Sequence, residues 1–241
     1  MQHDSNLAWQ ATIEGNYEAA CLMWEAILSA DKRFPYLNNF GITLLLAGNT
    51  ERAVEIFREA RNMPPKHITT PLLGAALWLN GEFESACNEW NQEIQRLKAK
   101  EIVYTDAAGG VRVASLLWWS ATHNGFGHWR KVAEDELKLR LHTSQSIKNW
   151  PRPVATFLLG NIQASKLFIE AQNRYSNVAE VQNRESCFYA GAKYLALGDT
   201  LESHKAYANT ISANSNLVAR GLTIARAEYH LASYELKFNP T

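Results

Sequence analysis

The 241-residue sequence contains few cysteines, no excess of either charge and no long apolar run. Cys21, Cys87 and Cys187 lie far apart and form no C-x-x-C pair, so neither a disulfide framework nor a zinc site is expected. We expect all three to be small core or near-core residues in a reducing compartment. Basic and acidic residues both number 24, which argues against nucleic acid or an anionic membrane as the main partner.

The N-terminus lacks the basic region and the apolar region of a signal peptide, and no segment is apolar enough to cross a bilayer. We therefore expect no membrane insertion and a cytoplasmic location. A periplasmic location would require that an export signal had been removed.

Patterns that carry chemistry are also scarce. Gly109-Gly110 and Gly125-x-Gly127 lack the Gly-Lys-Ser/Thr of a phosphate loop. His123 and His128, with Glu134 nearby, are too few for a metal site. The run Glu134-Asp135-Glu136 is typical of a solvated helix N-terminus. We expect a protein that is not an enzyme and has no metal site and no cofactor.

An internal repeat of 33 residues dominates the N-terminal part. Gly48 has counterparts at Gly15 and Gly81, and Phe57 has counterparts at Trp24 and Trp90. Self-similarity at this period is the signature of stacked repeats. Strand-like alternation is missing, and apolar residues recur at three- and four-residue spacing, which predicts helices.

Each unit reads as two helices joined by a glycine turn. In the second unit Gly48 can take the left-handed conformation that ends a helix, and Thr50 can cap the next one. Gly41 and Gly74 fall inside helices, where glycine costs about 1 kcal/mol relative to alanine, so we expect two helix backbones to approach closely at these positions. Pro64-Pro65 should end the unit.

The order Leu37-x2-Phe40-Gly41-x2-Leu44, Ala53-x3-Phe57, Pro65 resembles the tetratricopeptide repeat (TPR). Matching strings occur in residues 70–90, more weakly in 7–24, and again in 187–207. A 33-residue period also suits ankyrin repeats, and Thr70-Pro71-Leu72-Leu73-Gly74-Ala75-Ala76 is superficially similar to their motif. The large residues at 24, 57 and 90 favour TPR.

A narrower resemblance links the C-terminal half to bacterial NlpI-type lipoproteins. It rests on Phe157-Leu158-Leu159-Gly160-Asn161-Ile162, and on Cys187-Phe188-Tyr189-Ala190-Gly191 with the downstream Tyr194-Leu195-Ala196-Leu197-Gly198-Asp199. The resemblance implies an adaptor that docks other proteins and can form a homodimer. The chain departs from that family because it lacks the lipoprotein signal.

The predicted fold is all-α: a TPR-like, right-handed helical solenoid of antiparallel helix pairs. Residues 1–100 should form three pairs, 101–178 a degenerate middle, and 179–241 a last pair followed by one capping helix over 217–236. These parts should make one continuous solenoid domain.

A TPR stack presents a concave groove, and the usual family geometry implies its lining here. The predicted function is a non-catalytic scaffold or adaptor that binds a protein or peptide partner in this groove. The implied lining residues are Trp9, Thr12, Asn38, Asn39, Ile42, Leu45, Ala75 and Trp78, with Phe188 and Leu195 in the later repeat.

An alternative function is an immunity- or inhibitor-type protein that neutralises one toxin or enzyme by covering it. The irregular middle would then bind the target, because it carries several aromatic residues outside the repeat pattern. These residues are Trp118, Trp119, Phe126 and Trp129.

Overall fold

The computed structural model describes residues 2–63, 71–103, 106–123, 125–142, 149–212 and 217–238. Within these ranges it contains fourteen helices and no strand, which confirms an all-α fold. The right-handed superhelix and the TPR assignment stay predictions.

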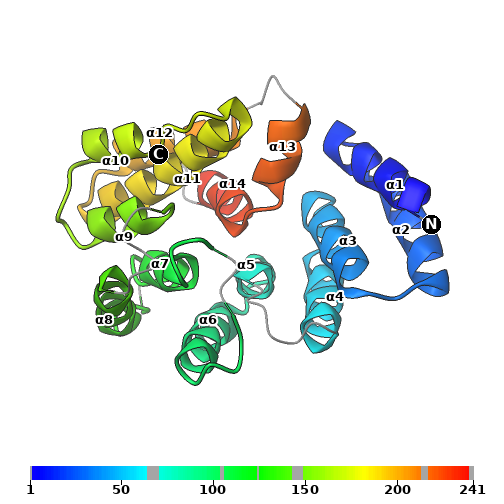
Figure 1. Cartoon of the computed structure of the whole chain (residues 1–241), viewed down its shortest axis with the longest axis horizontal. Helices are drawn as coiled ribbons and strands as arrows, with labels where there is room; N and C mark the ends of the chain where they lie inside the picture. The colour runs from blue at the N-terminus through cyan, green and yellow to red at the C-terminus, as the bar shows by residue number, and fades with distance from the viewer. Residues whose placement is uncertain are drawn as a thin grey trace.

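The first six helices form three consecutive pairs, and each helix packs against the next. Figure 1 shows the pairs side by side along the right-hand and lower edge of the molecule. Their bounds agree with the predicted units, although Pro64 and Pro65 lie outside the described residues. The helices are α1 (Gln2–Glu14), α2 (Tyr17–Ala30), α3 (Phe34–Leu46), α4 (Thr50–Asn62), α5 (Pro71–Leu79) and α6 (Phe83–Lys98).

The turn between α3 and α4 differs in one detail from the prediction. Gly48 has a φ of +79°, the expected left-handed conformation. The cap of α4 is Asn49 and not Thr50, because the Asn49 side chain accepts a hydrogen bond from the Arg52 amide at 3.3 Å. The Thr50 hydroxyl instead donates to the Asn80 side chain at 3.0 Å, which ties this turn to the next one.

The middle of the chain is helical throughout its described residues except for short connections. Its four helices are α7 (Val111–Ser120), α8 (Trp129–Leu141), α9 (Arg152–Leu158) and α10 (Ala164–Glu170). Helix α7 packs on α6, α8 and α9, and all its residues are buried. Helix α7 is therefore a buried central helix of the fold.

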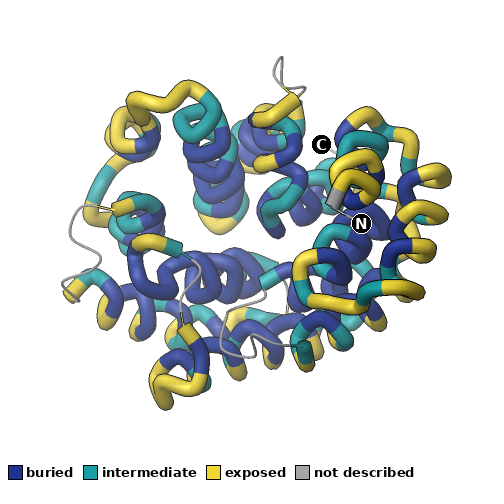
Figure 2. Tube along the Cα trace, turned by 45° about the vertical axis from the view of Figure 1, so that its right-hand side comes forward, coloured by how far each residue is buried: buried dark blue, intermediate teal, exposed yellow. Residues whose placement is uncertain are grey.

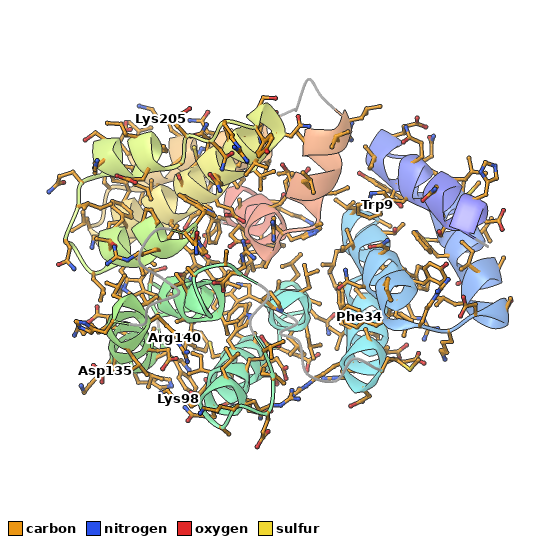
Figure 3. The ribbon with its side chains drawn as sticks, in the orientation of Figure 1. Trp9, Phe34, Lys98, Asp135, Arg140 and Lys205 are labelled. Carbon is orange, nitrogen blue, oxygen red and sulfur yellow. The ribbon has the colours of Figure 1, made fainter. Side chains whose placement is uncertain are left out.

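The carboxylate run Glu134-Asp135-Glu136 lies in the middle of α8, not at a helix N-terminus, and is only partly solvated. Asp135 is exposed and pairs with Lys131 at 2.8 Å. Glu136 is 1% exposed, and it accepts from Arg140 Nε at 2.6 Å while contacting Lys98 Nζ at 2.9 Å. Lys98 and Arg140 lie between α6 and α8 in Figure 3. Glu136 is therefore part of the α6–α8 contact, which corrects the prediction of a wholly solvated run.

The C-terminal part contains α11 (Ser176–Ala196), α12 (Thr200–Ile211), α13 (Leu217–Ile224) and α14 (Ala227–Phe238). The single capping helix predicted over 217–236 is wrong, because the chain breaks at Ala225-Arg226. The Arg226 side chain reaches Glu185 of α11 at 3.4 Å, and His230 Nε2 donates to the Ile224 carbonyl at 2.8 Å. Both contacts stabilise the break between α13 and α14.

The break changes the direction of the chain, so that α14 lies in the middle of the molecule. Helix α14 packs against α12, α11 and α5, while α13 packs against α11 and α1. Figure 1 shows α14 between α11 and α5, inside the arc of the other helices. In Figure 2 the buried segments face this interior and the exposed ones follow the rim. The C-terminal helices thus fill the inner side of the stack instead of capping its end.

Candidate interaction surfaces

The predicted groove positions are mostly buried. Ile42, Leu45, Ala75 and Trp78 are at most 6% exposed, and the Trp78 ring lies 4.7 Å from that of Trp119. Helix α14 packs on α5, which carries Ala75 and Trp78. The prediction that these four side chains line an open groove is therefore wrong for this structure, because the chain's own helices cover them.

The remaining groove positions divide into buried and half-buried residues. Thr12 is 1% exposed, so the prediction that it lines an open groove is also wrong, and its hydroxyl bonds to that of Thr43 at 2.8 Å, which joins α1 to α3. Trp9, Asn38 and Asn39 are half-buried. Trp9 points toward α13 in Figure 3. In the later repeat, Phe188 is buried and Leu195 is half-buried.

The aromatic residues of the irregular middle do not form an exposed patch. Trp118, Trp119 and Trp129 are at most 9% exposed. Phe126 is half-buried, with its ring 5.5 Å from that of Trp78. The predicted surface for an inhibitor's target is therefore part of the core, because these rings pack on neighbouring helices.

One carboxylate of α14 anchors that helix in the core. Glu235 Oε1 accepts from Trp119 Nε1 at 2.9 Å and lies 2.8 Å from His123 Nε2. The Tyr207 hydroxyl also accepts from Trp119 Nε1, at 3.2 Å. His123 is thus directed toward α14. In the described residues no group of three His, Cys, Asp or Glu side chains is placed to hold a metal ion.

A second buried network joins α7, α11 and the α13–α14 break. Arg112 Nη2 pairs with Glu185 Oε1 at 2.8 Å, and Arg112 Nε lies 3.5 Å from Glu228 Oε1. The Tyr189 hydroxyl donates to Glu228 at 2.8 Å. The Trp150 indole N–H donates to Glu185. A buried ion pair of this kind needs such extra partners to offset its desolvation.

The network shifts the pKa of each of its charged members. Burial disfavours the charged form of Arg112, but attraction to Glu185 and Glu228 outweighs this and raises its pKa. Burial by itself would raise the pKa of Glu185, but attraction to Arg112 and Arg226 outweighs burial and lowers it. Burial and then repulsion by Glu185 raise the pKa of Glu228. One carboxylate is therefore firmly ionised, whereas its neighbour takes up a proton more readily.

The backbone amides around the Gly109-Gly110 turn already bind a side chain of the protein. Asp106 accepts hydrogen bonds from the backbone amides of Ala108 at 3.0 Å, Gly110 at 3.1 Å and Arg112 at 3.2 Å. The amides at the start of α7 therefore bind a carboxylate of the chain.

Three adjoining hollows lie above this network. The largest, about 570 Å³, extends over α11 and the end of α12. The second, about 420 Å³, has Arg112 and Arg226 in its wall and shares Gln172 and Asn173 with the first. The third, about 300 Å³, shares Trp150 with the second. We call them together the polar trough, and its characteristic residues are Asn149, Trp150, Gln172, Asn173, Asn183 and Asn209.

The polar trough is rich in amides and carries more basic than acidic side chains. Asn149, Gln172, Asn173 and Asn209 are exposed, and Asn183 is half-buried. Glu170, Glu180 and Asp106 are the acidic lining residues. The basic lining residues are Arg112, Arg152, Lys166, Arg174, Arg184 and Arg226. When the buried Glu185 and Glu228 beneath the trough are both included, the six basic side chains compare with five acidic ones.

Sequence reasoning missed this region for an identifiable reason. Arg112 is the one charged residue in an otherwise apolar helix, VRVASLLWWS, and that isolation was the available signal for a buried ion pair. Glu185 and Glu228 carry no comparable local signal. Their contact with Arg112 depends on how distant helices pack.

Among the described helices none is both long and apolar enough to cross a bilayer. Comparison of the sequence with protein-family models and with curated proteins gave no match.

Proposed function

We propose that this chain is a non-catalytic protein-binding module that holds an extended, acidic segment of a partner polypeptide in the polar trough. The observation that carries the proposal is the row of exposed amides at Asn149, Gln172, Asn173 and Asn209. Each such side chain offers both a donor and an acceptor, so it can pair with the N–H and C=O groups of an extended backbone.

The charge of the trough selects the partner's chemistry. Six basic side chains line the trough against three acidic ones. Four of the six already pair with Glu170, Glu180, Glu185 or Glu228, so Arg152 and Arg174 are the lining residues that attract Asp and Glu residues or a C-terminal carboxylate. The chain as a whole is neutral, so this excess is local to the trough. The affinity should therefore fall as salt is added.

The repeat pattern supports a binding role of this type. Stacked helical repeats provide extended surfaces for other polypeptides, and the TPR resemblance supports assigning the chain to that class. The adaptor role is retained from the sequence, but its binding surface moves from the inner side of the stack to the trough, because the inner side is filled by α14.

The test uses a random library of 12-residue peptides panned against the immobilised full chain. Enriched peptides, labelled with a fluorophore, are then titrated by anisotropy at low and at high salt. We expect enrichment of Asp and Glu, an affinity that falls with salt, and a loss of about tenfold or more for the double variant Lys166→Glu, Arg174→Glu.

A matched control makes the same change in charge away from the trough. Lys131 and Lys138 are exposed and both lie on α8, which carries no trough residue, so Lys131→Glu, Lys138→Glu should retain binding to within about twofold. Equal losses in both double variants would indicate general charge attraction and overturn the trough assignment. Failure to enrich any sequence above a scrambled pool would also overturn it.

A further inference from the structure

The third hollow of the polar trough differs from the other two in its walls. Three half-buried apolar residues line it, Trp150, Pro153 and Ile162, whereas the first and second hollows have predominantly polar linings. Trp150 and Ile162 also pack against the hydrophobic core. The core therefore holds these side chains in place, while part of their apolar surface stays open to the hollow.

The position of Trp150 is fixed by a hydrogen bond of its own. Its indole N–H donates to Glu185, which is 3% exposed and pairs with Arg112 at 2.8 Å. Trp150 belongs to the walls of both the second and the third hollow. The ring therefore presents a preorganised apolar surface, which lowers the entropic cost of binding a side chain against it.

Arg152 supplies the charge of the third hollow. Its Nε is buried and has no hydrogen-bond partner among the residues that the structure describes. The other charged lining residues, Lys166 and Glu170, pair with each other at 2.8 Å. A partly desolvated guanidinium without an anionic partner is costly, and a carboxylate compensates it through a charge-assisted hydrogen bond. Arg152 is therefore the lining residue of this hollow that an acidic side chain satisfies.

The size of the hollow sets the spacing of the residues that enter it. Its volume of about 300 Å³ is at the lower end for ligand pockets, so Arg152 and the apolar wall are reached by neighbouring side chains. In an extended segment, side chains two positions apart point to the same side, whereas adjacent ones point to opposite sides. An acidic and an apolar side chain that share the hollow are therefore two positions apart.

We propose that the third hollow recognises an acidic residue and a large apolar residue two positions apart in an extended partner segment. The carboxylate binds Arg152, and the apolar side chain packs against Trp150, Pro153 and Ile162. This inference rests on the proposed function and deepens it, because it names the residue pattern that one part of the trough selects.

The first test uses the peptides that panning against the full chain enriches. In each one, the number of positions between an acidic residue and the nearest large apolar residue is counted and compared with the unselected library. We expect a separation of two positions to be enriched over separations of one and three.

A double-mutant cycle then tests the apolar contact. The tightest peptide is synthesised with an acetylated N-terminus and an amidated C-terminus, its apolar residue is changed to alanine, and both forms are titrated by fluorescence anisotropy. The change should weaken binding to the wild type about fivefold or more and binding to Ile162→Ser less than about twofold. Ile169→Ser is the matched control: Ile169 is 63% exposed on α10 and lines none of the three hollows, so this variant should behave as the wild type does.

A second cycle tests the carboxylate contact. The acidic residue of the same peptide is changed to its amide, which should weaken binding to the wild type about fivefold or more and binding to Arg152→Gln less than about twofold. Arg58→Gln is the control, because Arg58 is exposed on α4 and lies outside the trough. Circular dichroism establishes that each variant folds. The two cycles use different residues, so either one alone is decisive.

The possible failures separate this inference from the proposed function. Acidic peptides enriched without a preferred spacing, or equal losses in the wild type and in Ile162→Ser or Arg152→Gln, would overturn the residue pattern and leave peptide binding by the trough standing. Failure of panning to enrich any sequence would overturn both proposals.

Discussion

Single glycines set the distance between the two helices of three pairs, α3–α4, α5–α6 and α11–α12. A Cβ added at Gly41 would lie 2.6 Å from the Phe57 ring, and one at Gly74 would lie 2.3 Å from Trp90 Nε1. In the later repeat a Cβ at Gly191 would lie 3.0 Å from the Tyr207 ring. The same pairing of glycine and ring thus occurs in three units, and the ring lies directly on the partner helix's backbone.

We expect Gly74→Ala to lower the free energy of unfolding by about 1–3 kcal/mol despite alanine's better helix propensity. The Trp90 ring has little room to move, since its N–H also donates to the Pro71 carbonyl at 3.1 Å. Urea denaturation measures the change. Gly127→Ala is the control, because nothing lies within 4 Å of its added Cβ. A Gly74→Ala variant as stable as the wild type would contradict the packing described.

The sequence was informative wherever a residue's role depends on its own repeat. The periods at Gly48 and Phe57 located the pairs, and glycines inside helices correctly indicated close packing, although the close contact is with a ring and not with a second backbone. The sequence was uninformative about Glu185, Glu228 and Glu235. Their partners belong to other helices, so no local pattern records those contacts.

At the scale of elements, the break between α13 and α14 decides what occupies the inner side of the stack. An apolar periodicity continues through Ala225 and Arg226, so periodicity alone predicts one helix. The break depends on contacts that periodicity does not encode: Arg226 with Glu185, and His230 with the Ile224 carbonyl. The filled groove results from this turn, and Arg226 of the turn contributes to the wall of the trough. For that reason the site was less predictable than the helices.

His230 makes the break sensitive to pH. Burial lowers the pKa of His230 to about 4. The hydrogen bond to the Ile224 carbonyl acts in the opposite direction, but its effect is smaller. The unfolded chain takes up this proton below about pH 6.5, whereas the folded chain does so only near pH 4. The contribution of neutral His230 is therefore fully present above pH 6.5 and is lost as the pH falls toward 4.

We expect the wild type to lose about 2 kcal/mol of stability more than His230→Gln does between pH 7 and pH 5. Glutamine keeps an N–H donor and does not titrate. The raised pKa of Glu228 acts in the opposite direction but is common to both proteins, so the difference isolates His230. Urea midpoints at the two pH values provide the measurement, and parallel losses in both proteins would show that His230 is not the responsible group.

At the scale of the whole molecule, the contact of α13 with α1 joins the C-terminal helices to the first repeat. A Cβ at Gly221 would lie 2.9 Å from Ile13 Cδ1 and 3.4 Å from Trp9 Nε1. The contact is small next to the packing of α14 on α12. The first repeat should therefore separate from α13 more readily than α14 leaves the core.

Gly221→Leu should separate α13 from α1, because a leucine at this crossing needs space now filled by Ile13 and Trp9. Hydrogen exchange followed by mass spectrometry should then show faster exchange in α1 and α13 and unchanged protection in α7 and α11. Leu222→Val, at a neighbouring position that is 42% exposed, should leave the pattern of the wild type. If exchange rose equally in α7, the first repeat and the core would form one cooperative unit, and α13 would be a structural member of it. If instead α1 alone became labile, Trp9 would be uncovered without unfolding the rest, and this predicted groove position could then reach a partner.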